Sequence, residues 1–313
     1  MQSISIVIPA FNEEENISNI SNELILILNK TSFNYEIIFV NDGSIDSSEQ
    51  VLDNLNKNNP KVKYISFSRN FGHQAALQAG LSYASGDAVI TMDCDLQHPP
   101  ELIPEMIEKW KLGYKVVNAI RKYPPKTSIF KRMSSYYYYK LFNRLTNLSM
   151  IPGAADYKLY DKIVVEKLNA LKENARFIRG LSIWIGFDQT NVFYTAKDRA
   201  SGETKYSFTK MIHLALDGIT SFSNFPLRIA VYFGFIICFF SFFYLVYVLY
   251  IRLFTSSAIP GWASMITLIL FLGGVQLMTI GVVGIYIGKI FEEVKNRPLY
   301  IIDKVKLDSK KDK

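Results

Sequence analysis

Residues 89–102, with the sequence VITMDCDLQHPPEL, pass within a few positions from apolar side chains to two carboxylates and then to two prolines. An apolar run that ends abruptly is typical of a buried strand, and proline is favoured in the first turn of a helix. The stretch therefore predicts a strand over 87–95 that ends in the acids, followed by a helix over 99–113. This pair is the repeating unit of an α/β fold.

The same alternation extends through the first 121 residues. Further apolar runs predict strands over 4–10, 35–44, 61–68 and 114–121. Helical spacing or Ser/Asp capping residues predict helices over 12–30, 44–59 and 73–85. Because strand and helix alternate, we expect a mostly parallel sheet with helices on both faces. One α/β domain over 1–225 would contain it.

Two uncharged stretches, 229–251 and 263–288, follow this region. Each exceeds the roughly 20 residues that a helix needs to cross a bilayer. A pair of buried core helices is the alternative, but core helices rarely stay uncharged over about six turns. The sequence therefore predicts two membrane spans within 226–291. Gly284 and Gly288 form a GxxxG motif, which packing between the two spans would explain.

Lysine and arginine flank the two stretches on their outer sides, whereas the linker carries a single charge, Arg252. By the positive-inside rule, both termini and the α/β domain would be cytoplasmic and 292–313 would be a basic cytoplasmic tail. We expect a multi-pass protein of the cell inner (plasma) membrane. The two cysteines, Cys94 and Cys238, suggest neither a disulfide framework nor a zinc site. The start of the chain shows no signal-peptide pattern.

Polar residues gather where each predicted strand ends, and ligands of such sheets bind at the carboxyl ends of strands. They are Pro9, Phe11, Asn12 and Glu13; Asn41, Asp42 and Gly43; Arg69 and Asn70; Asp93, Asp95 and Gln97; and Arg121. Turn formation explains any one of these loops. Five together indicate a site.

Asp93 and Asp95 would share one face of a strand, with Cys94 on the other. Two close carboxylates repel unless a cation lies beside them. Oxygen ligands suit Mg²⁺ or Mn²⁺, which bind few carboxylates and take up substrate phosphates. The pair therefore predicts a cation with a diphosphate ligand. We expect His98 to be a solvated loop residue.

Several functions are disfavoured. The chain has no P-loop and no GxGxxG motif, which argues against kinases, NTPases and dinucleotide enzymes. With only three histidines, it shows neither an HExxH motif nor a Ser/His/Asp constellation. The net charge of +7 alone would allow nucleic-acid binding, but the basic residues gather near the apolar stretches instead of forming a stripe with aromatics. We expect no nucleic-acid partner.

The chain resembles family 2 glycosyltransferases in several ordered segments. They are SIVIPAFNEEENI (5–17), FVNDGSIDSS (39–48), the stretch from Arg69 through Ile103, NAIRKY (118–123) and RASGETKYS (199–207). The likeness covers nearly the whole chain and is strongest to polyprenyl-phosphate glycosyltransferases, among them dolichol-phosphate mannose synthases and bactoprenol glucosyltransferases. Two C-terminal spans resemble the bactoprenol branch.

The resemblance implies a glycosyltransferase A fold and an inverting transfer from a nucleotide sugar to polyprenyl phosphate with the help of Mg²⁺ or Mn²⁺. It implies these roles: Pro9, Phe11, Glu13, Asp42, Arg69 and Asp93 for the nucleotide sugar; Asp93, Asp95 and Gln97 for the metal; Arg121 for the diphosphate; Asp156 as the catalytic carboxylate; Arg199 and Lys205 for the acceptor phosphate. It also implies a homo-oligomer, with a tetramer as one form.

Two departures from the family pattern concern this site. Asn41 stands where many relatives carry Asp, which leaves the nucleotide preference open. Gly153, Ala154 and Ala155 precede Asp156, where close bactoprenol enzymes often have an acid, so the supporting contacts of Asp156 would differ.

An anionic lipid acceptor would explain two further segments. Tyrosines and cations interleave over 128–147, and a similar segment covers 204–223, as in amphipathic helices at the headgroup level. Ordinary surface helices are the alternative. A phosphate monoester has a second pKa of about 6, so the acceptor would already be a dianion near neutral pH. Asp156 would then position groups and need not remove a proton.

The sugar stays open. Glucose from UDP-glucose on undecaprenyl phosphate is the first choice, and UDP-GlcNAc, UDP-galactose, GDP-mannose and a modified aminopentose donor are alternatives. A transferase to a polysaccharide or another hydroxyl acceptor would fit the fold, but processive synthases carry a QxxRW-like motif that is missing here. A nonenzymatic membrane scaffold or flippase subunit is the other alternative, which the intact acidic residues disfavour.

Overall fold

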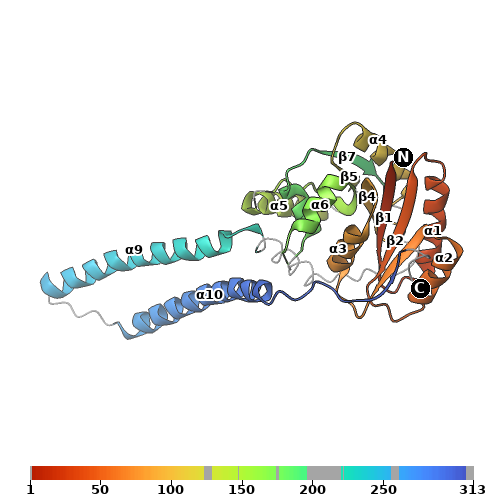
Figure 1. Ribbon diagram of the computed structural model, residues 1–313. Coiled ribbons are helices and arrows are strands. Elements are labelled where there is room, and N and C mark those ends of the chain that lie inside the picture. The colour runs from red at the N-terminus through yellow and green to blue at the C-terminus, as the bar shows by residue number, and fades with distance from the viewer. Residues whose placement is uncertain are drawn as a thin grey trace. The chain divides into compact units, whose positions relative to one another are not determined.

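A computed structural model describes residues 2–122, 129–146, 148–173, 176–195, 220, 222–254 and 261–307. The chain divides into two compact units, Met1–Tyr206 with Arg297–Lys313, and Ser207–Asn296 (Figure 1). The first unit is the α/β domain. The described part of the second is two long helices.

One sheet organises the first unit. Its strands are β1 (Ser3–Ala10), β2 (Asn34–Asn41), β3 (Val62–Phe67), β4 (Ala88–Thr91), β5 (Val116–Arg121), β6 (Ala154–Asp161), β7 (Gln189–Tyr194) and β8 (Ile302–Lys306), in the spatial order β7-β5-β6-β4-β1-β2-β3-β8. Parallel pairing joins β1 to β2 and β4, β2 to β3, and β5 to β7. Antiparallel pairing joins β6 to β4 and β5, and β8 to β3. The expected α/β fold with a mostly parallel sheet is confirmed.

The helices cover the sheet on both faces, as expected (Figure 1). Apolar side chains of α1 (Glu14–Leu28), α2 (Ser48–Asn58) and α4 (Ile103–Lys111) pack with Ile37 and Phe39 of β2 in one core cluster. The alternate residues Ile38 and Val40 face the other side and pack with α3 (His73–Tyr83). The other described helical segments of this unit are the 3₁₀ turn Pro100–Leu102, α5 (Ile129–Thr146), α6 (Lys162–Ala170) and α7 (Ile178–Trp184).

The antiparallel strand β6 corrects the simple alternation of the sequence analysis. It lies between β4 and β5 and pairs Lys158 with Thr91. The Thr91 hydroxyl donates a hydrogen bond of 2.6 Å to the carbonyl oxygen of Asp156. Tyr157 and Leu159 of β6 are fully buried, as apolar residues of a strand in the middle of the sheet should be. The insertion brings Asp156 next to the end of β4.

Helix α3 approaches β1 so closely that Gly80 has no room for a side chain. A Cβ added there would lie 2.1 Å from Cγ1 of Val7, a stiff β-branched residue. Gly80→Ala should therefore destabilise the domain by about 1–3 kcal/mol, although alanine favours a helix by about 1 kcal/mol. Thermal unfolding in detergent would measure this. The double variant Gly80→Ala/Val7→Ala should recover part of the loss; a single variant as stable as the parent would refute the close contact.

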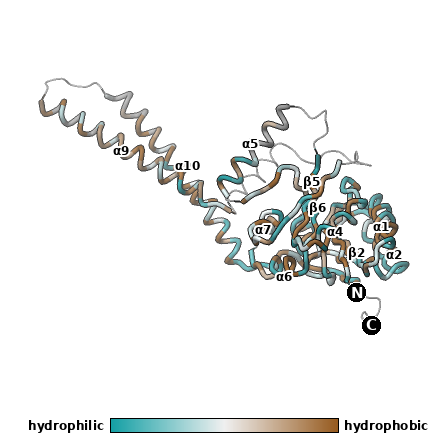
Figure 2. The backbone as a smooth tube through the Cα atoms, turned by 90° about the horizontal axis from the view of Figure 1, so that it is seen from above, coloured by the Kyte–Doolittle hydropathy of each residue, from teal (hydrophilic) through white to brown (hydrophobic). Residues whose placement is uncertain are grey.

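The second unit contains α9 (Phe225–Phe254) and α10 (Trp262–Val294), which include the expected spans 229–251 and 263–288. Both are long and apolar enough to cross a membrane, and Figure 2 shows the apolar residues along them in brown. Apart from neighbouring residues and the backbone of α10 itself, no described atom lies within 4 Å of a Cβ placed on Gly284 or Gly288. Within the described residues, packing between the two spans therefore does not explain the GxxxG motif.

The segment after α10 differs from the expected basic tail 292–313. Residues 302–306 form β8 on the edge of the sheet, because Tyr300, Ile302 and Leu307 pack against the apolar cluster beneath α3. This segment therefore belongs to the α/β domain and not to a tail. Residues 308–313 and most of the expected helix 204–223 lie outside the described residues.

Candidate functional site

The loops that follow β1 and β2 are bonded to each other. The backbone N–H of Asn12 donates to Oγ of Ser44 at 2.9 Å, and the N–H of Ile45 donates to Oδ1 of Asn12 at 3.0 Å. The N–H of Glu13 donates to Oγ of Ser48 at 3.0 Å. Asn12 has a φ of 55°, which asparagine tolerates better than most residues. Phe11, which is exposed, and Glu13 thus lie on a loop with a defined shape.

Asp42 connects the loop after β2 to the loop after β3. Its carboxylate accepts the backbone N–H of Phe71 at 2.7 Å and that of Gly72 at 2.9 Å. Burial raises the pKa of Asp42, although both N–H groups act in the opposite direction. The two loops lie so close that a Cβ on Gly43 would be 2.3 Å from the carbonyl carbon of Arg69. The carboxylate of Asp42 therefore shapes, from inside, the edge of the sheet at which β1 to β5 end in Phe11 and Glu13, Asp42, Arg69, Asp93 to Gln97, and Arg121, which we call the rim.

Asn41, the first departure from the family pattern, does not face the rim. It is buried; its Nδ2 donates to Oγ of Ser66 at 3.2 Å and its Oδ1 accepts the N–H of Ser44 at 3.0 Å. Pro9 is likewise buried within β1. Both residues shape the rim through the backbone. Arg69 is exposed, and its guanidinium lies 4.1 Å above the ring of Phe71.

Two histidines hold Asp93 at the centre of the rim. Nε2 of His73, from the start of α3, lies 2.9 Å from Oδ1 of Asp93, and Nε2 of His98 lies 3.6 Å from Oδ2. Nδ1 of His98 accepts the N–H of Asp93 at 3.0 Å, which places the proton of a neutral ring on Nε2. Burial raises the pKa of Asp93, but the charges of His98 and His73 lower it by more, so the pKa stays well below its usual range.

His98 is not the solvated loop residue that we expected. Its side chain is buried, and its ring stacks on Tyr157 of β6 with a centroid separation of 5.0 Å. The Tyr157 hydroxyl donates to the carbonyl oxygen of Pro99 at 2.9 Å. The loop after β4, residues 92–99, which we call the acidic loop, is therefore attached to the sheet at both His98 and Pro99. The inserted strand β6 supplies this surface, and the sequence analysis had not placed that strand.

The acidic loop also reaches Arg121, the last residue of β5. Nη1 of Arg121 lies 3.4 Å from Oε1 of Gln97, and the N–H of Gln97 donates to Oδ1 of Asp95 at 3.1 Å. The strand β4 ends at Thr91. Strand alternation therefore does not relate Asp93 to Asp95, which corrects that part of the sequence argument. With this contact, the expected convergence of the five loops is confirmed.

Asp156 lies on β6 beside this rim and forms a two-pronged ion pair. Nε and Nη2 of Arg179, from α7, donate to its two oxygens at 3.2 and 3.0 Å. Gln74 of α3 lies 3.5 Å from Oδ2 and also accepts the N–H of Ile178. The side chains of Asp156 and Arg179 are 12% and 25% exposed. Burial raises the pKa of Asp156, but the charges of Arg179 and His73 bring it below its ordinary value.

A second layer lies behind this pair. Lys158 shares a face of β6 with Asp156 and is buried, and its Nζ donates to Oγ of Ser182 at 3.0 Å. Burial lowers the pKa of Lys158 to about 7, and the charge of Arg179 adds to this effect. Arg179 and Ser182 lie three residues apart on α7 and so share its inner face. The layer fixes α7 against the sheet.

The oxygen donors of the rim fit a hard cation. Asp93 is 37% exposed, Asp95 and Gln97 are half-buried, and all three follow one strand. Among the described residues, no cluster of three or more His, Cys, Asp or Glu side chains could enclose a metal ion. Two carboxylates and one amide oxygen suit Mg²⁺ or Mn²⁺, which accept one or two carboxylates and complete their shell with water and phosphate oxygens.

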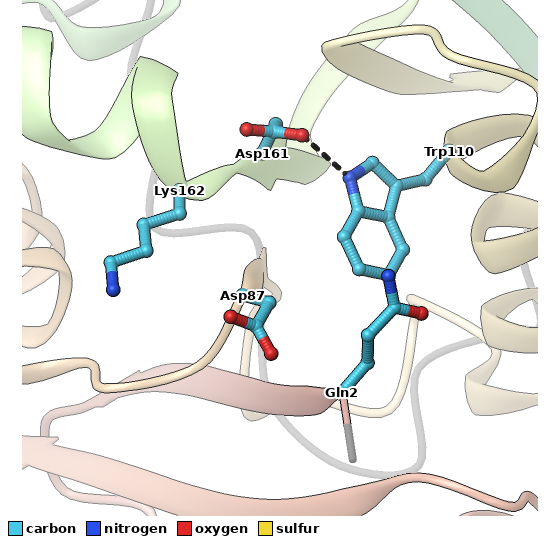
Figure 3. Close-up of a pocket in the computed structure, with 5 residues that line it drawn as sticks. All are labelled: Gln2, Asp87, Trp110, Asp161 and Lys162. Carbon is cyan, nitrogen blue, oxygen red and sulfur yellow. Dashed lines mark hydrogen bonds between the residues drawn. The ribbon is translucent and has the colours of Figure 1, made fainter.

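A separate pocket of about 470 Å³ lies at the opposite end of the strands. Gln2, Asp87, Trp110, Asp161 and Lys162 line it (Figure 3). Asp87 and Gln2 come immediately before β4 and β1, whereas the rim follows these strands. Asp161 accepts the indole N–H of Trp110 at 2.8 Å and also caps α6. The pocket is therefore remote from the acidic loop and its carboxylates already serve the fold.

Sequence reasoning missed four residues of the site, which are His73, Gln74, His98 and Arg179. The pair His73–Gln74 directly follows the loop after β3, so its position gave a usable signal. Arg179 stands in the mostly apolar stretch FIRGLSIWI (177–185), where a cation points to a buried partner. Arg199 and Lys205 lie outside the described residues.

Comparison with known proteins adds independent findings. The sequence model of glycosyl transferase family 2 matches residues 5–168. An uncharacterized glycosyltransferase of Bacillus subtilis (strain 168) is 46% identical over 300 residues, covering 96% of this chain and 93% of that protein. The bactoprenol glucosyl transferase of Shigella phage SfII is 42% identical over 301 residues, covering 96% and 97%. A solved glucosyl-3-phosphoglycerate synthase of Mycobacterium tuberculosis is 18% identical with a TM-score of 0.47, covering 70% and 78%.

Proposed function

The chain belongs to glycosyl transferase family 2, and we propose that it transfers a sugar from a nucleotide sugar to polyprenyl phosphate. Glucose from UDP-glucose and undecaprenyl phosphate are the first choices. One observation carries the proposal. The loops of the rim are hydrogen-bonded to one another, and they place Asp93, Asp95 and Arg121 next to the Asp156–Arg179 pair. Relatives that match over nearly the whole chain and are named bactoprenol glucosyl transferases support the lipid acceptor.

On the donor side, Asp93, Asp95 and Gln97 would hold Mg²⁺ or Mn²⁺. When bound, the ion supplies positive charge next to the departing diphosphate. Arg121 adds a fixed cation at the same edge, which is electrostatic stabilisation of the developing charge. Phe11 and Glu13 would bind the nucleoside on the exposed side of the rim, while Pro9 and Asp42 keep that side in shape.

On the acceptor side, Asp156 acts best as a positioning group. A carboxylate whose pKa is lowered by Arg179 is a poor proton acceptor. A phosphate monoester is a dianion above its second pKa of about 6 and needs no general base. Asp156 would then hold Arg179 and face the positive charge that develops on the sugar. Arg199 and Lys205 would receive the phosphate of the acceptor.

We further propose that α5 lies at the membrane surface, with the catalytic domain and both termini in the cytoplasm. Met133, Tyr137 and Leu141 are spaced four residues apart on one face of α5 and are 52%, 58% and 54% exposed. Lys140 and Arg144 are exposed beside them. An exposed apolar stripe flanked by cations is typical of a helix at the headgroup level.

Replacing Met133, Tyr137 and Leu141 by serine should lower transfer to polyprenyl phosphate in a bilayer at least about tenfold, because apolar contact with the lipid is lost. Transfer to a water-soluble short-chain analogue should stay unchanged. Leu26→Ser/Leu112→Ser/Ile163→Ser, at exposed positions of the same domain outside the five loops, is the matched control. An equal loss with both acceptors, or none in the bilayer, would contradict the assignment.

The function itself is tested with purified full-length protein, radiolabelled lipid phosphate and a panel of donors. The panel contains UDP-glucose, UDP-GlcNAc, UDP-galactose, GDP-mannose and a modified aminopentose donor. Sugar on the lipid, with donor consumption that depends on lipid phosphate, is the expected result. Transfer only to a polysaccharide or another hydroxyl acceptor would overturn the lipid assignment, and no turnover of any donor would favour a scaffold or flippase subunit. A homo-oligomer, with a tetramer as one form, stays a prediction.

A further inference from the structure

The segment that follows α10 is built into the catalytic sheet directly beside the rim. Strand β8 pairs antiparallel with β3, from Tyr64 opposite Lys306 to Phe67 opposite Ile302. One residue beyond β3, the N–H of Ser68 donates to the carbonyl oxygen of Ile301 at 3.0 Å. The pairing thus extends to the start of the loop that carries Arg69.

Tyr300, just before β8, begins a chain of aromatic contacts. Its ring stacks on Phe67 with a centroid separation of 4.9 Å and an interplanar angle of 10°. Phe67 is buried, and its ring meets Phe71 edge-on at 5.7 Å and 89°. Tyr300 therefore supports Phe71 through one intervening ring.

Phe71 in turn contacts two residues of the proposed donor site. The guanidinium of Arg69 lies 4.1 Å above the ring of Phe71. The backbone N–H of Phe71 donates to Oδ1 of Asp42 at 2.7 Å. The position of Phe71 therefore sets both the cation on the exposed side of the loop and the backbone that Asp42 holds. A continuous series of contacts therefore joins Tyr300 to Arg69 and Asp42, which belong to the part of the rim proposed to bind the nucleotide.

We infer that Tyr300 is a positioning residue for the nucleotide, contributed by the segment that follows the second apolar helix. The inference rests on the proposed function, because it takes the loop from Arg69 through Gly72 to bind the donor. Without the stacked ring, Phe67 and Phe71 would gain conformational freedom that nucleotide binding would have to remove. The effect should fall on the donor alone, since Asp156 and Arg179 touch none of these rings.

The test uses the full-length protein in lipid nanodiscs. Calorimetry measures the Kd of UDP and then of GDP, and transfer kinetics give the KM of the donor and of the lipid acceptor. Tyr300→Ala should raise the Kd of the nucleotide and the KM of the donor about fivefold, the scale of one aromatic pair. The kcat and the KM of the lipid acceptor should not change. Tyr300→Phe keeps the ring and should behave like the parent. Lys304→Ala, which removes the ion pair with Glu49 from the same strand, is the matched control.

The outcomes separate the inference from its premise. If the parent binds UDP and transfers sugar while Tyr300→Ala does so with the same Kd and KM, or with donor and acceptor KM raised together, the positioning role is refuted. If the parent neither binds a nucleotide nor transfers sugar, the proposed function itself fails. Should Tyr300→Ala not fold, Tyr300→Leu keeps apolar bulk without a stacking face and should show the same donor-specific increase.

Discussion

Replacing Asp93 and Asp95 together by alanine is expected to lower sugar transfer about a thousandfold or more, and excess chelator should do the same to the parent. The reason is electrostatic. In the proposed reaction the departing diphosphate would accumulate negative charge in a partly buried site, and the double variant would lack the two carboxylates proposed to hold the cation that offsets this charge. Arg121 alone would remain as a fixed positive charge.

The structure makes this prediction specific to the acidic loop. The pKa of Asp93 is held low by His98 and His73, so the carboxylate is ionised throughout the usual assay range. Asp53→Asn is a suitable control, because Asp53 lies on α2, outside the five loops, where it pairs with Lys57 of the same helix and accepts a hydrogen bond from Tyr64 of β3. Activity should be measured with saturating donor and lipid. Undiminished transfer by the double variant or in chelator would end the metal-dependent account.

Asp156→Asn should lower kcat by a factor of about 10²–10³, because asparagine keeps the shape of the side chain but loses the charge that we propose faces the reacting sugar. Arg179 would then be left partly buried without its anion, and removing one partner of such a pair is destabilising. Removing one partner of a fully buried pair costs about 3–5 kcal/mol. Since Arg179 stays 25% exposed, we expect a smaller loss of about 2 kcal/mol in the free energy of unfolding. Thermal unfolding of the same variant would measure it.

The pH dependence distinguishes a positioning carboxylate from a general base. The pKa of Asp156 is lower in the folded protein than in the unfolded chain. Its ionisation therefore stabilises the fold above the unfolded value of about 4, and this contribution is lost as the pH falls through the folded pKa. Between pH 6 and 8 the group does not titrate. The acid limb of the rate should instead follow the acceptor phosphate near pH 6, in parent and variant alike.

Asp161→Asn is the matched control for Asp156→Asn. It changes an acid of the same strand with similar exposure, 16% against 12%, but at the opposite end of the sheet. There Asp161 accepts hydrogen bonds from Trp110 and Lys115, so the variant should lose stability and keep its kcat. A base-limited profile in the parent that becomes flat in Asp156→Asn would contradict the positioning role.

Local patterns were sufficient for the parts of the site that follow parallel strands. Each apolar run ended in Asn, Asp or Arg, and the geometry of parallel sheets brings such ends together whatever the details of packing. Asp42, Asp93 and Arg121 were therefore assigned to one rim before their contacts were known. The failures came where the chain left the βα repeat. The antiparallel strands β6 and β8 are joined to the sheet by pairings between distant residues, which local spacing does not encode.

Periodicity and strand-end chemistry in the chain itself thus determined the α/β class, the acidic rim and the two long apolar helices. Folding decided which side chains face each other across separate elements. It buried His98 against Tyr157, paired Asp156 with Arg179, and placed Tyr300 against Phe67. The physical reason is the distance along the chain. Secondary structure depends on neighbours a few residues apart, whereas these contacts join residues 23 to more than 200 positions apart. Only a packed core selects these contacts among the many contacts that the composition would allow.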